Sequence, residues 1–457
     1  MRARTLTLLL FLTTSLVFGQ SKFSEKEVLD DLDALKNTLE ETHYNLFAYT
    51  SKNEFNERYQ ELKNGVSKDS LSLLETTNLF QKFTSSVNNG HTWIEFPIQS
   101  YMEYAENGGT VFPLELAFEN KKALIRKNWS GEDALLPGME IITINGVSIA
   151  NIVNQLYPQI SAEREYFKNA KIELYSFPRL YWQVFGETDE FSVTIKNNNS
   201  EKIYRLKAVP AIDGYEMKRD EVINATRQLD FFEEIAYLRP GGFGGDKEKY
   251  LAFIDSSFSE IKTRKSKHLI LDLRNNPGGD DSFSDYLVSF LADRPFQWNS
   301  KFSLKTSSFL KKHIRKNYDI STDFWQKALS HEDGEIYDYD FEDYQPQPTE
   351  KRFYGAVYVL VNRQSHSQAT VTAAQLQDYG FATVVGEETA EYPTLFASIF
   401  QFTLPNTGIA VNVSKGRIVR VNGSEKQEGV QPDIMIKDHL LDETDEILEG
   451  LKQQIGS

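Results

Sequence analysis

Two strand–loop–helix units in the second half of the chain constrain its fold more than any other feature. The first runs from an apolar stretch at 269–273 through the loop Asn-Asn-Pro-Gly-Gly at 275–279 to an amphipathic stretch at 283–291. The second runs from 356–361 through a polar loop at 362–368 into residues with helical spacing. Strands that alternate with helices predict a parallel sheet. Because loops that follow parallel strands emerge at one edge of the sheet, we expect the two loops to face each other.

The rest of the chain divides into regions by its hydrophobic pattern. Residues 21–105 are predicted to be mainly helical, because apolar side chains recur at every third or fourth position. Residues 106–215 are predicted to form a mainly β region, with an Asn-Gly turn at 145–146 followed by a helix, and a hairpin over 187–209. Residues 216–457 contain both strand–loop–helix units.

Residues 1–20 have the pattern of an export signal. Arg2 and Arg4 precede an uncharged apolar stretch at 5–18, which small residues follow. The stretch is too short to span a bilayer, although a membrane anchor is the alternative interpretation. We therefore expect export to a periplasm or to the cell exterior, with no membrane span after the signal is cleaved.

Composition narrows the functional classes. The chain contains no cysteine, which excludes disulfides, thiolate nucleophiles and cysteine-bound metal. Its formal net charge is −16, and loss of Arg2 and Arg4 with the leader makes it more negative. An acidic chain without a basic run repels phosphate backbones, so we do not expect nucleic acid as a partner.

A serine stands where the second helix is predicted to begin. The Ser367 hydroxyl would face the positive end of that helix, which suits a reaction that develops negative charge on oxygen. The alternative is a simple helix cap, and Ser365 competes for that role. Gly278 and Gly279 in the facing loop would let a carbonyl approach a backbone N–H closely, or they form only a tight turn.

Three separated motifs resemble one known family. "LILDLRNNPGG", "VYVLVNRQSHSQATVTAAQLQDYGFATVVGEETA" and "EGVQPDI" are similar to the tail-specific (C-terminal processing) serine peptidases, especially to their tricorn-like branch. The resemblance implies an α/β fold with a ClpP/crotonase-like peptidase core at 216–457. It also implies a PDZ-like β domain at 106–215, which contains "LPGMEIITINGVSI", and an N-terminal helical domain at 21–105.

The resemblance also assigns site residues. It places the nucleophile at Ser367, and the oxyanion donors at the backbone N–H groups of Gln368 and of Gly278 or Gly279. The tricorn-like branch takes its general base from a Gly-His motif, which matches Gly90-His91-Thr92 here. A histidine can accept the serine proton and later protonate the leaving amine near neutral pH. His366, beside the nucleophile, is expected to shape the site and not to act as base.

The chain departs from the family at two points. Tyr392 stands where the bacterial processing proteases carry a lysine base, and a tyrosine hydroxyl keeps its proton until about pH 10. The family places a glutamate that orients the histidine shortly before Gly-Val-x-Pro-Asp. Both Glu425 and Glu428 fall in that stretch, and the alignment does not choose between them, although Glu428 is preferred.

The resemblance implies a serine endopeptidase that cleaves polypeptides through an acyl-enzyme on Ser367, without a metal or organic cofactor, and the leader pattern at 1–20 predicts that it is exported. The PDZ-like domain would bind a substrate terminus or gate the cleft. The alternative is a non-catalytic peptide- or ligand-binding protein that keeps the peptidase scaffold. Polysaccharide hydrolysis would need two facing carboxylates, which the spacing does not indicate. The sequence indicates neither the cleavage preference nor the oligomeric state.

Overall fold

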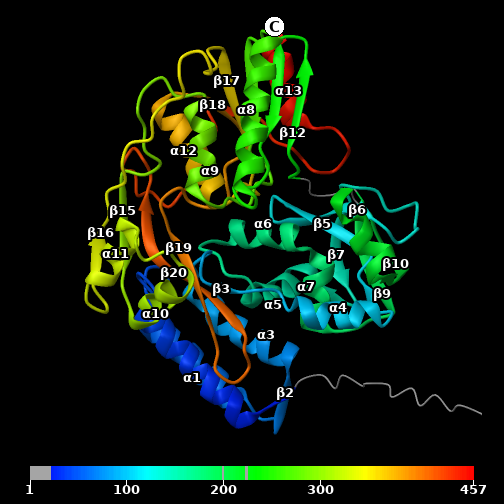
Figure 1. Cartoon of the computed structure of the whole chain (residues 1–457). Coiled ribbons are helices and arrows are strands. Elements are labelled where there is room, and N and C mark those ends of the chain that lie inside the picture. Colours follow the sequence, from blue (N-terminus) through cyan, green and yellow to red (C-terminus); the bar gives the residue numbers. More distant parts are fainter. Residues whose placement is uncertain (1–21, 198–199, 222–224, 457) are drawn as a thin grey trace, which may run out of the picture.

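The computed structural model describes residues 22–197, 200–221 and 225–456 (Figure 1). The predicted leader at 1–20 lies outside these residues. Three sheets of five or six strands organise the described chain, together with two short two-stranded pairs. Among the described helices, none is both long enough and apolar enough to cross a bilayer.

The predicted α/β core is built on a six-stranded sheet with the order β12-β13-β14-β17-β18-β21. The edge strand β12 is antiparallel to β13, and all other neighbours are parallel. The inner strands are covered on both faces, which explains their continuous apolar sequences. The strands of this sheet are β12 (Gln228–Phe232), β13 (Ile235–Arg239), β14 (His268–Asp272), β17 (Ala356–Val361), β18 (Thr383–Gly386) and β21 (Ile434–Met435).

Helices cover both faces of this sheet (Figure 1). On one face, the apolar side of three helices shares a core with the strands. A C-terminal helix packs against the opposite face. The predicted helix of the second unit begins at Gln368 and ends at Gly380, whose left-handed φ of 71° closes it. These helices are α8 (Lys247–Thr263), α9 (Asp281–Ser289), α12 (Gln368–Tyr379) and α13 (Glu446–Gly456).

A second sheet, with the order β16-β15-β20-β19 and with β3 paired to β20, carries most of the N-terminal helices. These helices bury their apolar faces against strands from the C-terminal half in a single core. Each of α1, α2 and α3 starts with a Ser-x-x-Glu capping box. The strands are β3 (Trp93–Ile94), β15 (Lys301–Lys305), β16 (Ile336–Asp338), β19 (Leu395–Thr403) and β20 (Ala410–Val419). The helices are α1 (Glu25–Thr42), α2 (Lys52–Gly65), α3 (Leu73–Thr84), α10 (Ser308–Asn317) and α11 (Asp323–Ser330).

Two short antiparallel pairs and several short elements complete these regions. Strand β1 precedes α1, and its partner β2 precedes α3. The pair β4–β11 brings together the two ends of the region 110–210, which contains the third sheet described below. Short helical turns connect the longer elements. These elements are β1 (Lys22–Ser24), β2 (Ser70–Ser72), η1 (Ser85–Val87), α4 (Ile98–Glu106), β4 (Thr110–Val111), η2 (Tyr157–Gln159), β11 (Val209–Pro210), η3 (Ala211–Tyr215) and η4 (Glu216–Glu221).

The third sheet is antiparallel, with the order β10-β9-β7-β6-β5 and with β8 paired to β7. The predicted hairpin is present as β9 and β10, and the predicted helix after the Asn-Gly turn is α5. The description of this region as mainly β omitted α6 and α7. The apolar period of α6 is interrupted by Lys171 and Glu173, which are buried because they make polar contacts to other parts of the chain. The elements are β5 (Leu114–Glu119), β6 (Lys122–Asn128), β7 (Glu140–Ile144), β8 (Val147–Ser148), α5 (Ile149–Leu156), α6 (Glu165–Tyr175), α7 (Phe177–Phe185), β9 (Glu190–Asn197) and β10 (Ser200–Lys207).

Candidate active site

Ser367 is presented to solvent at the turn between β17 and α12. Every residue from 359 to 376 is buried except Ser367, which is partly exposed. Its backbone has φ 51° and ψ −124°, a conformation that side-chain-bearing residues rarely adopt and that tends to mark functional sites. Although Ser367 is the N-cap of α12, its side chain makes no capping hydrogen bond. The competing Ser365 is buried and donates to the Leu273 carbonyl at 2.8 Å.

The two predicted loops meet at the carboxyl edge of the core sheet. The backbone N–H of His366 donates to the Asn276 carbonyl at 2.9 Å. The side-chain amide of Asn362 donates to the Asn275 side chain at 3.2 Å. The first loop thus lies directly against the loop that carries Ser367, as the parallel-sheet argument predicts.

His91 reaches Ser367 from a distant part of the sequence. Its Nε2 lies 3.0 Å from the Ser367 Oγ. The histidine follows η1 and precedes β3, and the pairing of β3 with β20 carries this loop to the core. Ser414 on β20 also donates to the His91 carbonyl at 3.1 Å. The N-terminal region therefore supplies an imidazole to a serine of the α/β core.

Glu391 completes the group, and the sequence did not predict it. Its Oε1 lies 3.0 Å from the His91 Nδ1, at ion-pair distance, although the two atoms are not aligned as a hydrogen bond. Its Oε2 accepts a hydrogen bond from the Ser367 backbone N–H. One buried carboxylate therefore contacts both the imidazole and the backbone of the serine.

The protonation of His91 and Glu391 is coupled. Burial favours the neutral imidazole, but the charge of Glu391 and its contact outweigh burial and raise the pKa of His91. Burial likewise opposes charge on Glu391, but the attraction of His91 holds the pKa of this carboxyl below its usual range. The carboxylate therefore stabilises the imidazolium that forms when the histidine takes a proton.

Backbone N–H groups surround the serine. The amides of Gln368 and Gly279 donate to no acceptor in the described part of the chain. Gly278 differs, because its N–H donates to the Asn276 side-chain oxygen at 2.9 Å. The Gly278 carbonyl accepts from the Phe243 N–H, and a trans peptide directs the Gly279 N–H to the opposite side, away from Phe243.

The two adjacent glycines are required by close backbone approach. A Cβ on Gly278, at φ 83°, would lie 2.7 Å from both the Gln368 nitrogen and the Ser367 Cβ. A Cβ on Gly279, at φ 138°, would lie 1.9 Å from the Phe243 carbonyl oxygen. The loop therefore turns the chain and also brings its backbone against the serine.

The orienting glutamate is corrected from Glu425 or Glu428 to Glu391. Glu425 pairs with Arg417 at 2.6 Å, and its side chain is 58% exposed. Glu428 lies 3.5 Å from Lys426 and is 45% exposed. Both stand on the loop after β20 and point to solvent. The edge rule for parallel sheets could have found Glu391, because this residue follows β18, the neighbour of β17.

Tyr392 and His366, which the sequence analysis also considered, are direct sequence neighbours of Glu391 and Ser367. Tyr392, where the resemblance implies a lysine, is buried with the Arg164 guanidinium 4.9 Å from its ring centroid. His366 is buried with its ring 5.1 Å from that of Phe167. Burial lowers the pKa of His366 to about 4, so its ring is neutral near pH 7. His366 contributes packing beside the serine, whereas His91 contacts the hydroxyl.

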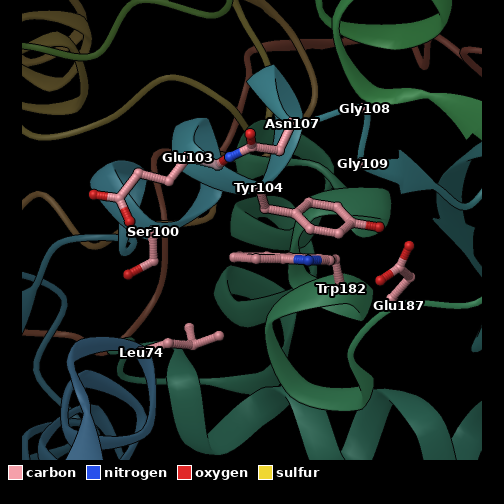
Figure 2. Close-up of a pocket in the computed structure, with 9 residues that line it drawn as sticks. All are labelled: Leu74, Ser100, Glu103, Tyr104, Asn107, Gly108, Gly109, Trp182 and Glu187. Atoms are coloured by element: carbon pink, nitrogen blue, oxygen red, sulfur yellow. The ribbon is translucent and has the colours of Figure 1, made fainter. Parts of the chain in front are cut away.

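A shallow groove of about 560 Å³ borders the glycine loop. It is lined by Ala225, Thr226, Arg227, Gly241, Gly242, Phe243, Gly244, Pro277, Gly278 and Gly279. A second pocket, of about 570 Å³, lies between α4 and α7, where Tyr104 lies over Trp182 (Figure 2). None of the predicted site residues lines the pocket in Figure 2, whereas Gly278 and Gly279 line the shallow groove.

Comparison with known proteins agrees with the geometry. Residues 234–436 match the model of peptidase family S41. The fold is similar to that of mature CPAF, with a TM-score of 0.65 and 15% identity over 94% of this chain and 96% of that chain. A structure of mature CPAF complexed with lactacystin gives a TM-score of 0.64 and 15% identity over 94% and 97% of the two chains. The photosystem II D1 C-terminal processing protease is 18% identical over 94% and 97%, with a TM-score of 0.46.

The family match covers the sheet, the glycine loop, Ser367 and Glu391, while His91 lies before it. The CPAF likeness extends over nearly the whole chain and includes the N-terminal region that supplies this histidine. The predicted α/β peptidase fold and the predicted enzyme class are thereby confirmed. The chain is a serine-type peptidase, and its core over residues 234–436 matches peptidase family S41.

Proposed function

We propose that the chain is an endopeptidase that cleaves polypeptides through an acyl-enzyme on Ser367. The observation that carries the proposal is the continuous contact from the Ser367 Oγ to the His91 Nε2, and from the His91 Nδ1 to Glu391. This arrangement lets a neutral imidazole accept the serine proton while a carboxylate stabilises the resulting positive charge.

The reaction follows from these contacts. His91 takes the hydroxyl proton as the Ser367 Oγ forms a bond to the substrate carbonyl carbon. When the tetrahedral intermediate collapses, the C–N bond breaks and His91 donates its proton to the leaving amine. Water then attacks the acyl-enzyme, losing a proton to His91, and the ester bond to Ser367 breaks. The serine regains its proton and the new carboxyl terminus leaves.

The oxyanion of the tetrahedral intermediate needs two N–H donors. We assign these to Gln368 and Gly279, whose amides donate to no described acceptor. Gln368 directly follows the nucleophile at the start of α12, where the helix dipole also favours negative charge. The Gly278 N–H is not assigned as a donor, because it already bonds to the Asn276 side chain. Its lack of a side chain leaves space beside Ser367 and the Gln368 amide.

The groove beside Gly278 and Gly279 supports internal cleavage of a chain. It is shallow, and the Gly278 that lines it packs against Ser367, so an extended polypeptide would pass across it without a blocked end. We also propose that the protein is exported, on the evidence of the charged start and apolar stretch of residues 1–20.

Covalent labelling with a fluorophosphonate tests the acyl-enzyme mechanism without knowledge of the substrate. The wild type should gain the mass of one phosphonyl group, and peptide mapping should place it on Ser367. Ser367→Ala should remain unlabelled, and His91→Ala should be labelled at least about 100-fold more slowly. A folded wild type that resists labelling as completely as Ser367→Ala would refute the proposal and favour a binding protein on a peptidase scaffold.

A further inference from the structure

One segment of the antiparallel module, residues 161–173, contacts all three loops that supply the site. It consists of the chain before α6 and most of α6, which lies between this module and the core (Figure 1). The His91 loop meets it through Gly90, and the serine loop meets it through Gln364. The loop of Glu391 meets it through Ala390, whose carbonyl accepts from the Arg164 guanidinium at 2.9 Å.

Two side chains of this segment hydrogen-bond to the backbone of Gly90, the residue directly before His91. Glu163 accepts hydrogen bonds from the Gly90 N–H at 2.7 Å and from the Asn89 side chain at 3.0 Å. Lys171 donates to the Gly90 carbonyl at 3.0 Å and to the Ser161 carbonyl at 2.7 Å. The peptide groups on both sides of Gly90 are therefore held by charged side chains, directly before the catalytic imidazole.

The same helix holds the serine loop. The Gln364 side chain donates to the Ala170 carbonyl at 2.8 Å and to Glu173 at 3.0 Å. Arg363 donates to Glu173 at 2.8 Å. Because Gln364 lies three residues before the nucleophile, α6 connects the backbone of the base to the backbone of the serine.

Lys171 and Glu163 are buried at positions that disfavour their charged forms. Burial lowers the pKa of Lys171 and raises the pKa of Glu163, which shows how strongly the site opposes each charge. Lys171 has no carboxylate within 4 Å among the residues that the structure describes. A buried charge without a close counter-ion is strongly unfavourable unless other polar groups stabilise it. Neither residue makes a hydrogen bond or an ion pair with Ser367.

We propose that Lys171 and Glu163 are positioning residues that fix His91 through Gly90 and balance the charge around its ring. The proposal rests on the peptidase mechanism above. It makes the antiparallel module part of the active site, since the base can lie against the serine only while this segment is docked.

The charges of the two residues act on His91 in opposite directions. The charged and titratable groups that face its ring are Glu391, Glu163, Lys171 and His366. Glu391 has the largest electrostatic influence and raises the pKa of His91 against burial; Glu163 raises it further, whereas Lys171 lowers it. Loss of the Lys171 charge should therefore move the acidic limb of activity to higher pH, and loss of the Glu163 charge should move it to lower pH.

The test measures the second-order rate of fluorophosphonate labelling against pH for the full chain. Lys171→Met should raise the midpoint of the acidic limb, and Glu163→Gln should lower it, each by about 0.5–1 pH unit. Both variants should also lose about tenfold or more of the limiting rate, because the backbone of His91 is no longer fixed. Lys171→Arg should retain the wild-type midpoint. Lys168→Met, on the same helix but without a contact to Gly90, should match the wild type.

A second readout keeps the test independent of activity and of one variant's stability. In a Ser367→Ala background, the pKa of His91 is measured from the NMR chemical shifts of labelled imidazoles, alone and combined with either Lys171→Met or Glu163→Gln. Midpoints that stay fixed, or that move in the same direction for both charge removals, would overturn the proposal. Absence of Ser367-dependent labelling in the wild type would instead refute the peptidase mechanism, and the NMR titration would still report on the two residues.

Discussion

The two strand–loop–helix units at the edge of the core sheet share one topology but contribute opposite chemistry. The loop after β14 contributes backbone alone, since Gly278 and Gly279 leave no side chain between it and the serine. The loop after β17 contributes a hydroxyl at Ser367. They are also held differently: Asn276 donates to the Gly241 carbonyl at 2.8 Å in the first, whereas Arg363 forms buried ion pairs in the second.

The difference shows how each kind of catalytic group is positioned. A backbone N–H is placed by close packing and by the absence of a Cβ, because a Cβ on Gly278 would meet the Gln368 nitrogen and a Cβ on Gly279 would meet the Phe243 carbonyl. A nucleophilic side chain instead needs its loop anchored, and here the anchor is a set of ion pairs to β5 and α6 of another module. Added side-chain atoms in the first loop should therefore lower the reactivity of Ser367. Removal of a charge that anchors the second loop should lower the stability of the core.

The largest expected effect is on the ionic anchor of the second loop. Arg363→Met would leave Glu119 and Glu173, both buried, without the guanidinium that lies 2.8 Å from each. Loss of one partner of a buried pair typically lowers the free energy of unfolding by about 3–5 kcal/mol. Urea unfolding of the core should show this loss. Arg417→Met, which breaks the exposed pair with Glu425, should lower the free energy of unfolding by about 1 kcal/mol or less. If the two variants lose equal stability, the second loop does not depend on its buried ion pairs.

The next effect is on the backbone of the first loop. Gly278→Ala would put a Cβ 2.7 Å from the Gln368 nitrogen, at a φ of 83° that disfavours alanine. The labelling rate of Ser367 should fall by about 10²–10³-fold, as expected when an oxyanion donor is displaced. Gly244→Ala is the matched control in the same groove, because nothing lies within 4 Å of its Cβ position. A Gly278→Ala protein that reacts as fast as this control would show that the loop does not form the oxyanion site.

A smaller effect should follow from loosening the first loop without adding atoms. Asn276→Ala removes the hydrogen bonds of its side chain to Gly241 and Gly278. The loss of buried hydrogen bonds should destabilise the core by about 1–3 kcal/mol. The labelling rate should fall less than in Gly278→Ala, since the oxyanion space stays open. A larger loss than in Gly278→Ala would mean that the bond from the Gly278 N–H, and not clearance, is the main requirement.

Sequence patterns predicted the core well because its elements are locally determined. β17 was predicted at its observed bounds and α12 to within one residue of its observed start, since an apolar run and a helical period lie on either side of a polar loop. The rule that parallel strands end at one edge also predicted that the two loops meet. α6 was missed because its period is broken by Lys171 and Glu173, whose partners lie far away in sequence.

The candidate site was predictable only in part for the same reason. The positions of Ser367 and His91 followed from motifs, and the structure brings them together across 276 residues of sequence separation. The glutamate was sought in a motif after β20, whereas Glu391 follows β18 at the catalytic edge. Short-range spacing could not separate these acids, because the choice depends on which strand ends beside β17.

The most direct test of the account compares three glutamates by the rate of fluorophosphonate labelling against pH. Because Glu391 raises the pKa of His91 above its usual 6.5, the wild-type rate should rise through a midpoint above pH 6.5 as the imidazole loses its proton. Glu391→Gln should lower that midpoint and reduce the limiting rate by about 10²–10⁴-fold. Glu425→Gln and Glu428→Gln should behave as the wild type. An unchanged Glu391→Gln, or an equal loss in Glu428→Gln, would contradict the assignment of Ser367, His91 and Glu391 as one catalytic unit.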